Sequence, residues 1–172
     1  MPHTVRPNAV FDALTTAGLA CATIDYRLAG EAIWPAQRDD VNAAIDFIAA
    51  HADQYGIDAD RVGIWGESAG AHLALMAAMT NPHVKAAVAW YPLTDIAALD
   101  VECGGLPESL WLSGLPSALP QRMAEASPIT YVTAAAPPCM LVHGDADTIY
   151  PPSQSELCYR RLRRVQTLLN GP

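Results

Sequence analysis

The segment Gly66-Glu67-Ser68-Ala69-Gly70 holds the residues of this chain that are best placed to do chemistry. The apolar run at 61–65, which is partly β-branched, predicts a short buried strand before it, and the Ala-rich run at 69–79 predicts a core-facing helix after it. A serine between glycines at a strand-to-helix turn matches the G-x-S-x-G nucleophile elbow, a turn so tight that its neighbours must be small. The helix N-terminus then offers backbone N–H groups to a developing anion. The sequence therefore predicts a nucleophilic Ser68; a purely structural serine is the alternative.

A serine nucleophile needs a base, and the base needs a carboxylate that orients it. The stretch 143–151 carries Asp145 and Asp147 just after an apolar, strand-like run. Sites in open α/β sheets form at the carboxyl ends of the strands. We prefer Asp147, because it lies farther into the loop and can reach across the sheet edge, whereas Asp145 would more naturally cap the turn. The alternative is that both carboxylates only cap a turn.

Strand and helix signals alternate along the chain that must position these residues. The pattern predicts strands at 19–26, 61–65, 84–91, 138–143 and 165–169, and helices at 8–16, 35–55, 69–79 and 153–163. The long second helix has apolar side chains at i, i+3, i+4 and i+7, and Gly56 is its stop signal. Such alternation indicates βαβ units, hence an α/β fold with a mostly parallel sheet and helices on both faces.

The region 94–136 lacks clear periodicity and is rich in Pro and Gly. Only short helices, at 108–112 and 118–124, are predicted within it. A long irregular segment of this kind is usually functional, so we expect a lid-like insertion within one domain spanning 1–172. Its apolar residues fit a pocket wall or ordinary core, and include Leu110, Trp111, Leu112 and Leu115.

Composition excludes several classes of protein. The 172 residues suit a single domain, and the 51% hydrophobic and 16% charged content is that of a globular core. A net charge of −8 argues against nucleic-acid binding, and the arginines at 160–164 fit a solvated helix face better than a binding site. No apolar run is long enough to span a membrane, and no secretory signal is visible. The four cysteines show no C-x-x-C spacing and no Cys/His cluster suggests zinc, so a reduced, cytoplasmic protein without a metal is expected.

Several blocks together make a resemblance plain. The chain resembles the α/β-hydrolase superfamily, in particular its carboxylesterase branch of hormone-sensitive-lipase-like and feruloyl-esterase-like enzymes. The matching blocks are Asp25-Tyr26-Arg27-Leu28, residues 35–40, residues 55–62, Gly66 to His72 and His143 to Pro151.

The resemblance implies hydrolysis of small-molecule carboxylic esters through an acyl-enzyme, without a cofactor. Ser68 would be the nucleophile, Asp147 the triad acid and the Ala69 N–H one oxyanion donor within the Gly66–Gly70 elbow. The region 94–136 would be the cap. We further hypothesise that Arg27 and Asp40 pair beneath the site.

The chain also departs from the superfamily pattern. Triad order there is Ser, Asp, His, and none of the five histidines follows Asp147. His143 is better interpreted as structural, and His72, on the elbow helix, starts on the wrong side of Ser68. The superfamily's upstream His-Gly-Gly loop is not found either, and the strand before it would lie between 19–26 and 62–65. Without that strand the two must pair directly or leave unpaired edges. We therefore expect a fragment that lacks its general base.

Three alternatives stay open at this point. The chain could be a non-catalytic remnant or pseudoenzyme of the same fold, or a peptidase or lipase of the same superfamily, because the elbow is common to all of them. A binding module that presents the pocket to a ligand has no sequence feature in its favour. The sequence leaves a homo-oligomer open.

Overall fold

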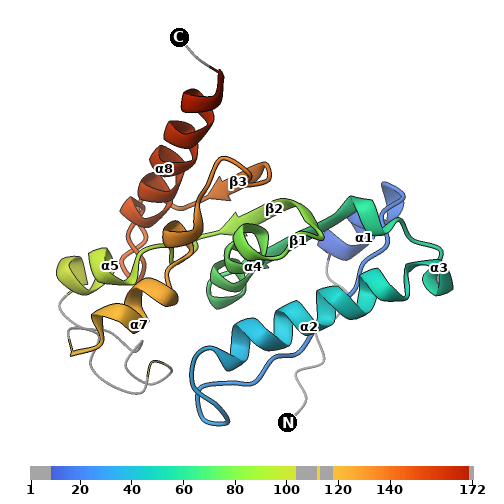
Figure 1. Ribbon diagram of the computed structural model, residues 1–172, viewed down its shortest axis with the longest axis horizontal. Helices are drawn as coiled ribbons and strands as arrows, with labels where there is room; N and C mark the ends of the chain where they lie inside the picture. Colours follow the sequence, from blue (N-terminus) through green and yellow to red (C-terminus); the bar gives the residue numbers. More distant parts are fainter. Residues whose placement is uncertain (1–8, 104–111, 113–117, 171–172) are drawn as a thin grey trace.

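A three-stranded parallel sheet lies at the centre of the computed structural model, which describes residues 9–103, 112 and 118–170 (Figure 1). Its order is β1-β2-β3, with β1 at Val62–Glu67, β2 at Val84–Trp90 and β3 at Cys139–Val142. The register pairs Glu67 with Trp90 and Trp90 with Val142, so the last residues of the three strands are aligned. Three predicted strands and the α/β class with a parallel sheet are confirmed. The loops that follow the strands therefore meet at one edge.

Helix α4 (Ala69–Thr80) covers one face of this sheet. Its residues from Ala71 to Ala78 are buried without interruption, as expected of a helix that is apolar on all sides. Two further helices flank it on the same face: α2 (Ala36–Ala50) packs Val41 and Ile45 into the first core cluster, and α8 (Ser153–Asn170) packs Cys158 and Leu162 into the second. On the other face of the sheet, Met140 is 60% exposed and Val142 39% exposed.

The first helices follow the predicted pattern with small changes. Helix α1 covers Ala9–Thr16, and Asn8 lies outside the described residues. The long second helix divides at His51 into α2 and the short α3 (Ala52–Tyr55). Gly56 ends it in the left-handed conformation at φ +64°, where a glycine has no steric penalty. A 3-10 turn, η1 (Ala59–Arg61), then leads into β1.

The predicted strand at 19–26 is wrong. These residues form no strand, and Leu19 and Ile24 are 50% and 37% exposed. The physical reason is that, within the described residues, no strand lies beside them to complete a hydrogen-bond ladder. Strand β1 correspondingly has one unpaired edge in the described part of the chain, which is the second of the two outcomes that the sequence left open.

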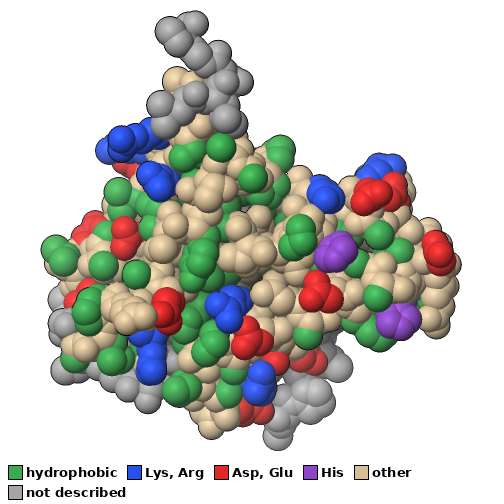
Figure 2. Space-filling model, in the orientation of Figure 1, with side chains coloured by type: hydrophobic (Ala, Val, Ile, Leu, Met, Phe, Trp, Pro, Cys, Tyr) green, Lys and Arg blue, Asp and Glu red, His purple; other side chains and the backbone are tan. Residues whose placement is uncertain are grey.

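The predicted last strand at 165–169 is also wrong, because helix α8 continues through it to Asn170. Val165 lies one turn after Leu162 and packs against the same core cluster, so the apolar face of the helix extends past the predicted end. The Thr167 hydroxyl also donates to the carbonyl of Arg163, four residues back, at 2.9 Å. The basic residues of α8 are exposed (Figure 2), as expected of a solvated face: Arg160, Arg161, Arg163 and Arg164.

The described parts of 94–136 form two helices and a 3-10 turn: α5 (Ile96–Cys103), α7 (Pro120–Glu125) and η3 (Pro128–Tyr131). Ile96, Leu99 and Leu112 are at most 1% exposed and join the main core cluster, so Leu112 belongs to the core. The rest of the predicted helix at 108–112 lies outside the described residues. The cap role of this region stays a prediction. Within the described residues, no helix combines the length and apolar character needed to cross a bilayer.

An ion pair fastens the exposed segment that precedes α2. The Arg27 guanidinium donates to both carboxylate oxygens of Asp40, with Nη2–Oδ1 at 2.7 Å and Nε–Oδ2 at 2.9 Å. The Arg27 backbone N–H also donates to Asp40 Oδ2, at 2.9 Å. These bonds, first of all those from the Arg27 side chain, lower the pKa of Asp40 from 3.8 to about 2. The predicted pairing of Arg27 with Asp40 is confirmed.

We expect Asp40→Asn to lower the free energy of unfolding at neutral pH, and the deficit to disappear in acid. A carboxyl group whose pKa is depressed in the folded state stabilises it above the unfolded pKa, and that contribution is lost as pH falls from about 4 to about 2. Urea unfolding of both proteins at pH 6, 4 and 3 measures the difference. Asp39→Asn is the matched control, because Asp39 is exposed and forms its ion pair with the adjacent Arg38. A deficit that stayed constant with pH would contradict this account.

Candidate active site

Ser68 occupies the turn between β1 and α4 in a strained conformation. Its φ of +53° and ψ of −122° are unusual for a residue with a side chain. The turn is fixed from both sides, since the Ser68 N–H donates to the Trp90 carbonyl at 3.0 Å and the Ser68 carbonyl accepts from the His72 N–H at 3.1 Å. The predicted strand–turn–helix arrangement is therefore present around Ser68.

The two glycines of the segment have different roles. A Cβ at Gly66 would lie 2.3 Å from both the carbonyl carbon and oxygen of Gly70, and 2.8 Å from the Ala71 nitrogen. Real Cβ atoms do not approach backbone so closely, so Gly66 is required by the contact between strand and helix. A Cβ at Gly70 would meet nothing within 4 Å apart from its own helix. Only the first glycine of the motif is a steric necessity.

The Ser68 hydroxyl is left available for chemistry. Serine at the start of a helix commonly accepts a hydrogen bond from the first turn, but the Ser68 side chain makes no such capping bond. The Ala69 N–H belongs to the first turn of α4, where backbone donors have no partner within the helix. A half-buried hydroxyl thus lies next to free donors at the positive end of a helix.

Asp147 lies in the loop after β3 and uses its two carboxylate oxygens differently. Oδ1 accepts the N–H groups of Ile149 and Tyr150, at 2.9 and 3.0 Å. These bonds lower the pKa of Asp147, and the nearby His143 adds to the effect. Oδ2 makes no hydrogen bond within the described residues and lies 3.6 Å from His143 Nε2. Asp147 therefore performs the turn capping that the sequence suggested for Asp145, and it keeps one oxygen open.

Two nearby histidines have structural partners. His143 Nδ1 lies 2.8 Å from the Ser155 hydroxyl, and its Nε2 lies 2.8 Å from the Tyr150 carbonyl. His72 is buried in α4, with Nε2 2.7 Å from the Ala126 carbonyl, and burial lowers the pKa of His72 to about 4. The His143 contacts fit its predicted structural role, and the His72 ring contacts the Ala126 carbonyl and makes no hydrogen bond to Ser68.

The other histidines do not complete a triad within the described residues. His51 Nδ1 contacts the Phe47 carbonyl of its own helix at 2.7 Å, His83 is exposed in the turn before β2, and His3 lies outside the described residues. None of the described histidines hydrogen-bonds Ser68. The described part of the chain also contains no group of three metal-ligating side chains.

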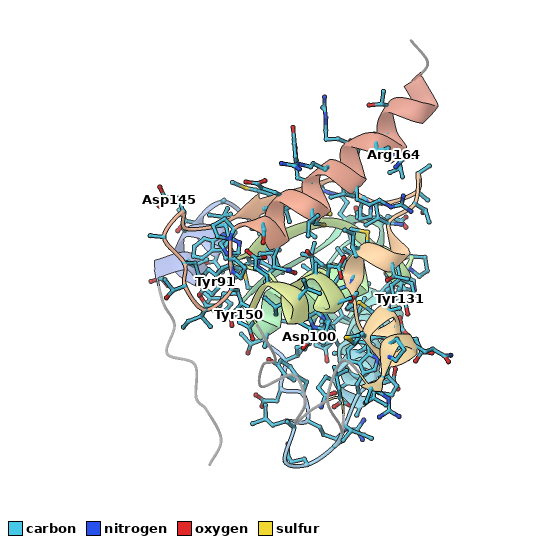
Figure 3. All side chains as sticks on the ribbon, turned by 90° about the vertical axis from the view of Figure 1, so that its left-hand side faces the viewer. Tyr91, Asp100, Tyr131, Asp145, Tyr150 and Arg164 are labelled. Carbon is cyan, nitrogen blue, oxygen red and sulfur yellow. The ribbon has the colours of Figure 1, made fainter. Side chains whose placement is uncertain are left out.

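Tyr91, which sequence reasoning missed, follows β2 at the same edge. It is, with Ser68, one of the two residues other than glycine with positive φ in the described chain, at +42°. Its phenol donates to Glu67 Oε2 at 2.8 Å, and its N–H donates to the Val142 carbonyl. Figure 3 shows Tyr91, Asp145 and Tyr150 on the same side of the molecule. A positive φ at tyrosine has no sequence signal; only its position at the end of a predicted strand could have drawn attention to it.

The chain is similar to known families and proteins. Residues 4–162 match the model of the BD-FAE family. "Esterase LipC" of Mycobacterium tuberculosis (strain ATCC 25618 / H37Rv) is 33% identical over 179 residues, covering 94% of this chain and 44% of LipC. "Probable carboxylic ester hydrolase LipM" of the same organism is 32% identical over 169 residues, covering 88% of this chain and 39% of LipM. The chain spans about two fifths of the length of these relatives.

Solved structures have the same fold. A "truncated form of carbohydrate esterase from gut microbiota" superposes with a TM-score of 0.76 at 30% identity, covering 83% of this chain and 61% of that one. A bifunctional GH43-CE protein of Bacteroides eggerthii gives 0.77 at 33% identity, covering 82% and 24%. The carboxylesterase Cest-2923 of Lactobacillus plantarum WCFS1 gives 0.64 at 22% identity, covering 83% and 55%, which supports the fold alone.

The contrast between the two glycines is testable. Gly66→Ala should destabilise the protein strongly, because its Cβ would collide with backbone at 2.3 Å, whereas Gly70→Ala should leave stability unchanged or raise it by up to about 1 kcal/mol. Thermal and urea unfolding of the two variants measure the contrast. Equal stabilities would mean that the helix and strand do not approach as described.

Proposed function

The chain belongs to the BD-FAE family of α/β-hydrolase carboxylesterases, and we propose that it takes part in ester hydrolysis with Ser68 as the nucleophile. One observation carries this proposal: an uncapped serine hydroxyl at φ +53° lies at the same sheet edge as the loop of Asp147, whose Oδ2 is open. Relatives named as esterases support the reaction class.

The chemistry follows from the roles of these groups. The Ser68 oxygen attacks the ester carbonyl while its proton passes to an imidazole, and Asp147 Oδ2 accepts the imidazole N–H and stabilises its positive charge. The Ala69 N–H stabilises the tetrahedral oxyanion. The protonated imidazole then protonates the departing alcohol, and water hydrolyses the acyl-enzyme by the same steps. Since His72 and His143 have other partners, this imidazole has to come from outside the described residues.

Esters of carbohydrates are the substrate class we propose to test first. The similar structures at 30% and 33% identity include a protein named as a carbohydrate esterase. Peptidase activity and lipase activity have less support, because the curated relatives are named as esterases. Hydrolysis of acetylated sugars, compared with p-nitrophenyl acetate and an aminoacyl amide, separates these classes.

We also propose a cytoplasmic location. Burial raises the pKa of Cys139 to about 11 and that of Cys158 to about 12, so both stay protonated thiols, and neither is in a disulfide. Free cysteines support a reducing compartment. Homo-oligomer formation stays a prediction, for which analytical ultracentrifugation is the test.

A fluorophosphonate probe should label Ser68, and Ser68→Ala should abolish the labelling. Because the imidazole lies outside the described residues, labelling is measured with and without added imidazole, and peptide mass spectrometry identifies the site. Ser153→Ala, which changes a half-buried serine at the start of α8 bonded to Glu102, is the matched control. If a folded sample stayed unlabelled in both conditions, the chain would be a non-catalytic remnant.

Asp147→Asn should slow Ser68-dependent ester hydrolysis by about 10³- to 10⁴-fold, because an amide cannot stabilise an imidazolium as a carboxylate does. Asp145→Asn, two residues away in the same loop, should change the rate by less than about twofold, since Asp145 is exposed and makes no side-chain hydrogen bond within the described residues. The thermal midpoint of each variant separates catalysis from loop stability. Asp147 is not the orienting acid if both substitutions slow hydrolysis equally, or if Asp145→Asn slows it more than Asp147→Asn.

A further inference from the structure

Tyr91 connects the two loops that carry the proposed reacting groups. On one side, the carbonyl of the preceding residue, Trp90, accepts the Ser68 N–H at 3.0 Å. On the other side, the Tyr91 N–H donates to the carbonyl of Val142, the last residue of β3, at 2.6 Å. The single peptide group between Trp90 and Tyr91, at the end of the middle strand, therefore bonds both the elbow and the strand that leads to Asp147.

The Tyr91 side chain adds a contact to the elbow itself. Its phenol donates to Glu67 Oε2 at 2.8 Å, and Glu67 is the residue immediately before Ser68. Burial, the bond to Glu67 and the charges of Glu67 and Asp147 all raise the pKa of Tyr91, so the phenol keeps its proton at neutral pH. The phenol of Tyr91 therefore interacts electrostatically with the carboxylates of both Glu67 and Asp147.

We propose that Tyr91 is a positioning residue, which fixes the Ser68 elbow relative to the Asp147 loop through the phenol–Glu67 hydrogen bond. A charge-assisted bond of this kind resists rotation of the peptide that orients Ser68. The left-handed conformation of Tyr91 supports the inference, because strained residues persist where surrounding contacts over-determine them. The expected effect of Tyr91 on catalysis rests on the proposed function, whereas the hydrogen bonds that connect the elbow, Tyr91 and Val142 do not.

Tyr91→Phe tests the link by removing a single oxygen. Acylation of Ser68 by the fluorophosphonate probe should slow about tenfold, with the KM for p-nitrophenyl acetate within about twofold and the thermal midpoint nearly unchanged. Tyr159→Phe is the matched control, because Tyr159 is 57% exposed on α8 and lies outside the site. Its acylation rate should equal that of the unmodified chain.

Variants at Glu67 distinguish positioning from a general structural role. Glu67→Gln keeps an acceptor for the phenol and should retain most of the rate, whereas Glu67→Ala should resemble Tyr91→Phe. The double variant Tyr91→Phe/Glu67→Ala should be no slower than either single one, because both remove the same contact. The positioning role would be overturned if the rate losses of the two single variants added up in the double variant, or if Tyr91→Phe reacted as fast as Tyr159→Phe. In either case, labelling of Ser68 in the unmodified chain would still support the proposed function.

Amide hydrogen exchange tests the link independently of catalysis. If Ser68 of the unmodified chain is never labelled, the proposed function fails, and the positioning role is decided by exchange in a peptide covering 66–70. Tyr91→Phe should make this exchange faster, and Tyr159→Phe should not. Unchanged exchange in Tyr91→Phe would overturn the link as well.

Discussion

The close approach of a strand to the helix that follows it is the contact on which the rest of the site depends. Gly66 lies against the backbone of Gly70 with no room for a single further carbon atom. This contact bends the chain within one residue and forces Ser68 into its positive φ. The bend points the hydroxyl away from the ordinary N-cap role and leaves the first-turn N–H groups free.

The parallel sheet places the turn at Ser68 next to the loops that follow the other two strands. Three strands that end in register bring the residues after them to one edge, although Ser68, Tyr91 and Asp147 are far apart in sequence. Backbone bonds between consecutive loops then link the edge, from Ser68 to Trp90 and from Tyr91 to Val142. The middle strand contributes no reacting group, but its end is bonded to both neighbours. The geometry of the edge therefore depends on β2 as much as on the loops that carry the reacting groups.

Sequence reasoning succeeded where one local pattern decides the outcome and failed where partners decide it. The strand and helix around Ser68 were predictable from apolar spacing and small residues. The Arg27–Asp40 pair was a hypothesis that accompanied the family resemblance, and the structure contains it. The segment 19–26 has a strand-like composition, but a strand also needs a neighbour, and the described residues supply none. At 165–169 the predicted strand is replaced by helix, because Val165 continues the packing of Leu162 against the same core cluster. The conformation of Tyr91 depends on backbone contacts that leave no mark in the sequence.

In the loop after β3, the Asp147 carboxylate can cap the turn with one oxygen and still offer the other to a partner. The Ile149 and Tyr150 amides bond Oδ1 of Asp147, which fixes the plane of the group and keeps it ionised. A fixed, ionised carboxylate with its second oxygen open is what an imidazole N–H requires of its orienting acid. His143 stays beside that oxygen at 3.6 Å, but its ring nitrogens already contact Ser155 and Tyr150. The loop thus leaves Oδ2 without a hydrogen bond within the described residues, and turn capping through Oδ1 is compatible with the catalytic role that we propose for Asp147.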